Sequence, residues 1–150
     1  MTVITATSTR AGARVGNAHI SRSIALRALG AALALAVAYI HVKDQGGLPG
    51  DKSPSYIAYG YWMLEIAGVV AAVALSTARG RQLAWSWALT AGVALGPIVG
   101  YVMSRGPGLP NYTDDKGVWT EPLGLVSLAV EGALLVVAAA VLFRSRRRSR

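Results

Sequence analysis

Four long apolar segments dominate the chain, separated by short polar connections. Each holds about 20 residues, enough at a rise of about 1.5 Å per residue to cross roughly 30 Å of hydrocarbon. None alternates apolar and polar residues with the period of two that a membrane β-barrel needs. Because backbone polar groups in hydrocarbon must be satisfied within their own segment, we predict an all-α bundle of four transmembrane helices, at about residues 23–42, 56–78, 83–103 and 122–143.

Composition supports a membrane protein over a soluble one. Hydrophobic residues make up 53% of the 150 residues and charged residues 15%, against about 25% charged in an ordinary soluble domain. The mean hydropathy is +0.44. A net charge of +8 would suggest nucleic acid in a soluble protein, but here the basic residues flank apolar segments. We therefore expect the lipid bilayer, and no nucleic acid, as a partner.

The basic residues divide unequally between the two sides of the predicted membrane domain. Eleven of the 15 Lys and Arg residues fall in the N-terminal region, the connection between the second and third helices, or the C-terminal tail. The positive-inside rule then places both termini in the cytoplasm of a multi-pass plasma-membrane protein. The acidic residues of the connections all fall on the opposite side.

The two ends of the chain differ from the membrane domain, which we place at residues 21–143. Residues 1–20 are rich in Ser, Thr, Ala and Arg, and we expect a disordered basic tail there. Residues 144–150 form a second basic tail. An alternative interpretation takes the first apolar segment as a cleaved signal peptide, since it follows basic residues and contains A-x-A triplets. Three helices would then remain in the membrane.

The connection from Ser104 to Glu121 is longer than most loops of a compact domain. Its Gly and Pro residues favour tight turns, and Tyr112 and Trp119 are typical interfacial anchors. We expect this loop to be ordered and folded over the outer mouth of the bundle, where Asp114, Asp115, Trp119 and Glu121 are candidate functional residues. A flexible surface loop is the alternative.

Two carboxylates lie inside predicted helices. Glu65 and Glu131 are each about 12–13 Å from the outer end of their helix, so their depths match. An ionisable group at this depth is costly, which makes each a candidate for binding a proton, cation or small polar ligand. The alternative is structural, with each Glu hydrogen-bonded to a neighbouring helix. If both face one cavity, we expect at least one to be protonated and the pair to titrate together.

Helical spacing places further polar residues near these carboxylates. Ser127 lies one turn before Glu131, and Tyr61 lies one turn before Glu65. His41, at the outer end of the first helix, could be a metal ligand, a proton relay or an ordinary interfacial histidine.

The third helix carries a stripe of small residues and an internal proline. Gly92, Gly96 and Gly100 recur every four residues, which is typical of a face that packs closely against another helix or drives dimerisation. Pro97 lacks a backbone donor and should bend the helix. We expect the glycine face to be buried against another helix. An alternative role for the bend at Pro97 is to free a backbone carbonyl toward a polar pocket.

The residue inventory argues against a resident metal or cofactor. The chain has no cysteine, so thiolate zinc sites and iron–sulfur clusters are excluded. Neither Glu65 nor Glu131 is followed by His three residues later, so the di-iron bundle motif is absent. Haem ligation by two histidines would need His19, which lies in the predicted tail. We expect no cofactor and no metal.

The segments HVKDQGGLPG, YGYWMLEIAG and SRGPGLPNYTDDKGVWTEPLGLVSLAVEG resemble those of uncharacterised small four-helix integral membrane proteins of actinobacteria. The resemblance covers about Tyr39 to Ala140 and implies a bacterial plasma-membrane protein, without implying an activity.

Three functions remain open from the residues. The first is binding of a proton, cation or small polar ligand at the intramembrane carboxylates, with transport across the membrane. The second is a non-enzymatic accessory or scaffold subunit, in a homo-oligomer or a larger membrane complex. The third is a membrane-embedded enzyme with Glu65 or Glu131 as acid or base. Against this third function, the sequence contains no recognisable nucleophile and no cofactor motif.

Overall fold

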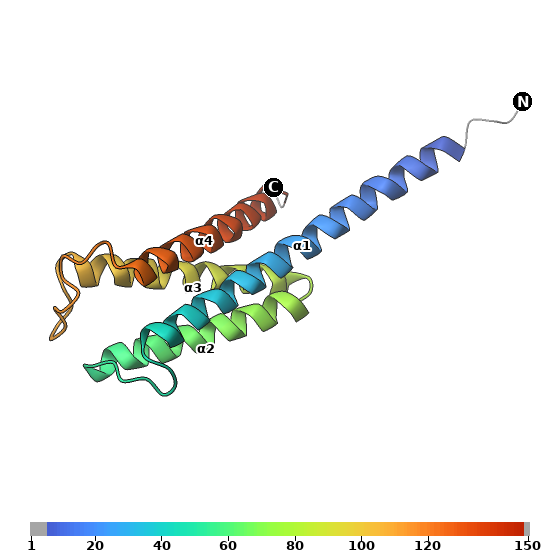
Figure 1. Ribbon diagram of the computed structural model, residues 1–150. Helices are drawn as coiled ribbons and strands as arrows, with labels where there is room; N and C mark the ends of the chain where they lie inside the picture. The colour runs from blue at the N-terminus through green and yellow to red at the C-terminus, as the bar shows by residue number, and fades with distance from the viewer. Residues whose placement is uncertain (1–5, 149–150) are drawn as a thin grey trace, which may run out of the picture.

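The computed structural model describes the backbone of residues 6–148 and the side chains of residues 21–147. Four helices follow one another along the chain, each long and apolar enough to span a membrane (Figure 1). No strand occurs in the described part. The prediction of an all-α protein with four such helices is confirmed. The helices are α1 (Ala6–Asp44), α2 (Ser55–Thr77), α3 (Arg81–Arg105) and α4 (Pro122–Arg148).

Both terminal helices are longer than the sequence pattern predicted. Helix α1 begins at Ala6, so residues 6–20 continue the helix where we expected a disordered tail. Proline is absent before Pro49, so nothing interrupts the helix as it leaves the apolar segment. Helix α4 likewise runs through the basic residues to Arg148. Residues 1–5 and 149–150 of the two predicted tails lie outside the described residues.

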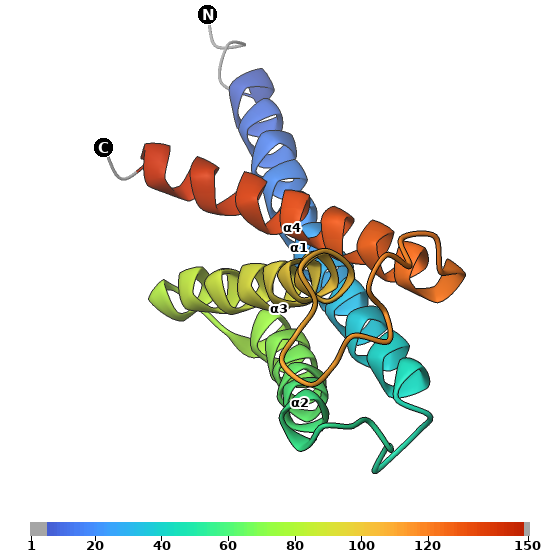
Figure 2. The same cartoon turned by 90° about the vertical axis from the view of Figure 1, so that its left-hand side faces the viewer.

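The helices form an antiparallel ring in which each packs against its sequence neighbours and α1 also packs against α4. The loops at residues 45–54 and 106–121 lie at one end of the bundle, which we call the loop end. The short α2–α3 turn lies at the other end. From that turn α2 and α3 diverge toward the loop end, as both views show (Figures 1 and 2).

Two close helix contacts join α1 to α2 and to α3. A Cβ atom added at Gly68 of α2 would lie 2.9 Å from the Ala34 carbonyl oxygen and 3.1 Å from the Ala38 Cβ. A Cβ at Gly30 of α1 would lie 2.8 Å from the ring of the buried Trp87. These two glycines therefore let the helices approach closely around the apolar core.

The glycine stripe of α3 has no such role, and the prediction that it is buried against another helix is wrong. A Cβ at Gly92, Gly96 or Gly100 would meet no atom within 4 Å. All three positions are exposed. The reason is the divergence of α2 from α3, which leaves this face open where closer helices would have covered it.

A side chain of α1 caps the end of α2 beside the α2–α3 turn. Arg27 Nε donates to the Leu75 carbonyl at 2.6 Å, and its Nη2 donates to the carbonyls of Ser76 at 2.9 Å and Ala78 at 3.1 Å. Carbonyls at a helix C-terminus have no partner within the helix, and a cationic side chain there is favourable. Arg27 thus joins α1 to α2 at the end opposite the loops.

Candidate functional site

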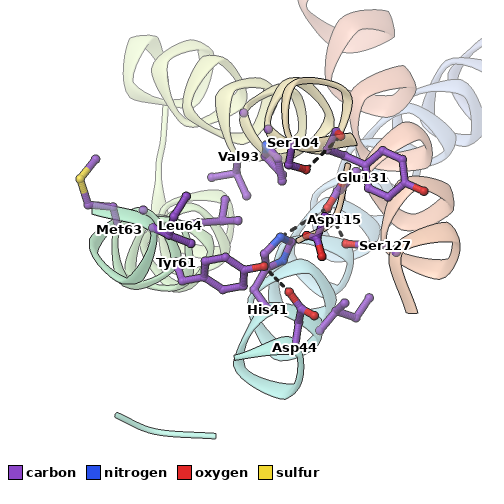
Figure 3. Close-up of a pocket in the computed structure, with 18 of the residues that line it drawn as sticks. His41, Asp44, Tyr61, Met63, Leu64, Val93, Ser104, Asp115, Ser127 and Glu131 are labelled. Atoms are coloured by element: carbon purple, nitrogen blue, oxygen red, sulfur yellow. Dashed lines mark hydrogen bonds and ion pairs between the residues drawn. The ribbon is translucent and has the colours of Figure 1, made fainter. Parts of the chain in front are cut away.

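A cavity of about 540 Å³ occupies the loop-end half of the bundle. All four helices and the 106–121 loop contribute to its lining. The wall is mainly apolar, with a few polar side chains that converge from α1, α2 and α4 (Figure 3). A cavity of this size and character is typical of a small-molecule site.

Glu131 is the deepest acidic group of the cavity. It is only 1% exposed, and its Oε1 accepts a hydrogen bond from Ser127 Oγ at 2.6 Å. His41 Nε2 lies 3.8 Å from the same oxygen (Figure 3). Glu131 Oε2 accepts no hydrogen bond from the side chains of residues 21–147. Half of this buried carboxyl group is therefore available to a ligand.

His41 is held in one orientation beside Glu131. Its Nδ1 lies 2.9 Å from the Val37 carbonyl, which can only accept, so Nδ1 carries the proton. In the neutral ring Nε2 is then the unprotonated nitrogen and faces Glu131. The ring packs against Tyr61 with 5.4 Å between centroids. His41 and Glu131 can thus share a proton, or form an ion pair when His41 is charged.

Tyr61 and Asp44 form the side of the cavity nearest the loop end. The Tyr61 hydroxyl donates to Asp44 Oδ2 (Figure 3). Lys52, from the 45–54 loop, lies 3.3 Å from the same oxygen and 5.2 Å from the centre of the Tyr61 ring. The Asp44 charge is thereby compensated within the protein.

The 106–121 loop lies over the loop end of the cavity and is held chiefly by Arg105. The Arg105 guanidinium lies 3.4 Å from Asp115 and 3.2 Å from Glu121, and it stacks 3.9 Å from the centre of the Tyr101 ring. Glu121 also accepts a hydrogen bond from the Gly124 backbone N–H at 3.1 Å and so caps the start of α4. The loop is folded over the bundle as the sequence predicted.

Further contacts fix the middle of this loop. The Tyr56 hydroxyl of α2 donates to the Pro110 carbonyl at 2.6 Å, and the Tyr101 hydroxyl donates to the Trp119 carbonyl at 2.7 Å. The Tyr112 hydroxyl donates to Asp115 at 2.9 Å. Burial raises the pKa of the Tyr112 phenol, and the hydrogen bond to Asp115 raises it further. Tyr112 is therefore neutral at physiological pH.

Glu65 does not belong to this cavity, so the prediction that both carboxylates face one cavity is wrong. Glu65 is 8% exposed and accepts a hydrogen bond from the fully buried Gln45 at 2.8 Å. It borders a separate hollow between α1 and α2. A Cβ at Gly50 would lie 2.6 Å from the Gln45 side chain, so the 45–54 loop wraps closely over this pair. Glu65 thus joins α2 to the 45–54 loop, whereas the structural alternative supposed a hydrogen bond to a neighbouring helix.

The other predicted residues divide between the cavity and the surface. His41, Tyr61, Ser127, Glu131, Asp115, Glu121, Pro97 and the three glycines of α3 all line the cavity. Trp119 packs on Tyr101 outside it, and Asp114 is exposed.

Sequence reasoning missed Asp44 and Arg105 as residues of this site. Both lie at helix ends, where a charged residue ordinarily faces water, so their position gave no functional signal.

Among the described residues, no group of three or more His, Asp or Glu side chains is placed to hold a metal ion. Stable metal sites generally use three or four such groups. The chemistry of the cavity instead suits a proton or a cation bound at a single carboxylate.

No protein-family model, no curated protein and no solved structure matches the chain.

Proposed function

We propose that this protein is an integral plasma-membrane protein that binds a small cation or polar molecule in the cavity, with Glu131 as its charge partner, and moves it across the membrane. The observation that carries this proposal is the state of Glu131. The carboxyl group is buried beside a cavity, uses one oxygen for Ser127, and has no Lys or Arg partner among residues 21–147. A buried carboxylate without a counter-ion is costly, and a bound proton or cation removes that cost.

A proton and a cation would compete for the same carboxyl group. The proton has a second acceptor nearby, because His41 Nε2 lies 3.8 Å from Glu131. Release of a proton through His41 would leave Glu131 charged and ready for a cation. Cation binding is then expected to weaken as the pH falls.

The experiment that tests this proposal compares two intramembrane glutamates in one chain. Tritiated tetraphenylphosphonium serves as the probe, with the protein in dodecylmaltoside micelles. Glu131→Gln should lower its affinity about tenfold or more, since a paired charge in a dry site contributes more than about 1.4 kcal/mol. Glu65→Gln is the matched control, because the new amide can still accept from Gln45.

Equal affinity in the wild type and the Glu131→Gln variant would contradict the proposal. Binding to the wild type should also be stronger at pH 8 than at pH 5, and this dependence should vanish in Glu131→Gln.

We propose further that the loop end faces the outside and both termini face the cytoplasm. The 11 to 4 distribution of basic residues supports this orientation. Alkaline phosphatase fused after Arg150 should be inactive, whereas the enzyme inserted beside Lys116 should be active, because it folds only outside the cytoplasm. The opposite pair of activities would invert the topology and place the cavity on the cytoplasmic side.

An accessory or scaffold subunit remains the second candidate. The observation that favours it is the open face of α3, where Gly92, Gly96 and Gly100 could accept a helix of another chain. In the first proposal a ligand occupies this face, and in the second a helix of another chain does. Only the second therefore predicts that a substitution at Gly96 changes the oligomeric state.

A further inference from the structure

We infer that the cavity takes its ligand from the lipid phase, through an opening between α2 and α3, and that the ligand is an amphiphile with one ammonium group and an apolar body. This inference rests on the proposed function, because it assigns a ligand class and a route to the same site.

The opening is defined by lining residues that are themselves exposed. On α2 these are Tyr56, Gly60 and Met63, of which Met63 is 72% exposed. On α3 they are Leu89, Gly92, Gly96 and Gly100. These positions lie within helices apolar enough to span a membrane, so a gap here faces hydrocarbon and not water. The divergence of α2 from α3 toward the loop end creates this gap (Figures 1 and 2).

The route from the aqueous side is obstructed by contrast. The 106–121 loop lies across the loop end of the bundle (Figure 2). It is tied to α2 by Tyr56 and Pro110, and to α3 by Arg105 and Asp115. A ligand in water would have to break these contacts, whereas a ligand in the bilayer meets an open side.

Charge indicates an ammonium group. Asp44 is paired with Lys52, and Asp115 and Glu121 are paired with Arg105. Among the described residues, Glu131 is the one acidic side chain of the cavity with no Lys or Arg partner. One unpaired carboxylate in the cavity matches one positive charge on the ligand.

The remaining surface indicates an apolar body. The path from the opening to Glu131 passes the glycine stripe of α3 and the apolar side chains of Leu64 and Val93. The three glycines leave open space where side chains would otherwise stand. An alkyl or aryl group can therefore lie along α3 while its headgroup reaches Glu131.

The experiment uses two amines that differ only in chain length. Methylammonium remains in water, and dodecylammonium partitions into the bilayer. Binding of each radiolabelled amine is measured by dialysis against the protein in phosphatidylcholine nanodiscs, with empty nanodiscs as background. Dodecylammonium should bind, with a loss of about tenfold in Glu131→Gln, and methylammonium should show no saturable binding.

A matched pair of glycine variants tests the opening. Gly96→Leu places a branched side chain in the opening and should weaken dodecylammonium binding about tenfold. Gly132→Leu is the control, because Gly132 has the same open surroundings on α4 but lies outside the cavity lining. Its affinity should stay within about twofold of the wild type, a difference below about 0.5 kcal/mol.

Three results would overturn the inference. If only methylammonium binds, and does so through Glu131, access is from water while the proposed function stands. If neither amine depends on Glu131, the proposed function fails as well. If the wild type is a dimer in nanodiscs and Gly96→Leu makes it a monomer, the opening is covered by a second copy of the chain.

Discussion

Replacing Gly68 with leucine should unfold the bundle, whereas the same substitution at Gly96 should leave it folded. At Gly68 even the Cβ atom would lie 2.9 Å from the Ala34 carbonyl oxygen, a backbone atom that cannot move aside cheaply. Overpacking of a buried contact costs about 1–3 kcal/mol, and a branched side chain forced between two helix backbones belongs at or above the upper limit. At Gly96 there is nothing within 4 Å to displace.

The measurement is unfolding of each variant by SDS added to dodecylmaltoside micelles, followed by far-UV circular dichroism. Gly68→Leu should unfold at a much lower SDS fraction than the wild type or fail to accumulate. Gly68→Ala is an intermediate variant that should lose part of the stability. A Gly96→Leu variant as unstable as Gly68→Leu would show that the α3 stripe is packed after all.

The contrast between these glycines shows where sequence reasoning reached its limit. The spacing of Gly92, Gly96 and Gly100 is the more regular pattern, yet the close approach occurs at Gly68 and Gly30. A small-residue stripe permits close packing but does not require it. Whether the neighbour approaches depends on the angle between helices, and α2 and α3 diverge toward the loop end (Figures 1 and 2).

Glu65 and Glu131 also show what the sequence could not predict, namely the direction in which a side chain points. Counting residues along a helix gives depth, and Glu65 and Glu131 were placed at matching depth on that basis. Depth does not give the direction in which a side chain points. The face of α2 that carries Glu65 and Gly68 packs against α1, while Tyr61 turns toward the cavity. Sequence reasoning therefore wrongly joined Glu65 to the cavity that Glu131 lines.

The features that the sequence predicted correctly are those indicated by many residues of one segment together. Long apolar runs specify spanning helices because hydrocarbon offers no other partner to the backbone, and the four helices follow from that alone. The loop at 106–121 was expected to be ordered because of its turn residues and aromatic anchors. Its attachment through Arg105 could not be foreseen, since it depends on two carboxylates ten and sixteen residues away.

Substitution of Arg27, at the end of the bundle away from the cavity, is the second change from which we expect a large loss of stability. The Arg27 guanidinium donates to three carbonyls at the C-terminus of α2, at 2.6, 2.9 and 3.1 Å. Arg27→Met keeps much of the apolar stem but leaves these three acceptors without their donor. Hydrogen bonds from a charged group contribute about 1.5–3 kcal/mol each when buried, and water near the helix end replaces part of the loss. We expect a net destabilisation of about 2 kcal/mol.

The matched control for this prediction is Arg22→Met. Arg22 is exposed on the same helix and near the same end, so both variants remove one positive charge from the same side of the membrane domain. SDS unfolding should be shifted by Arg27→Met and left nearly unchanged by Arg22→Met. Because the cavity lies in the other half of the bundle, Arg27→Met should still bind the cation probe with wild-type affinity while folded. Equal shifts in the two variants would mean that charge, and not the three hydrogen bonds, accounts for the stability that Arg27 contributes.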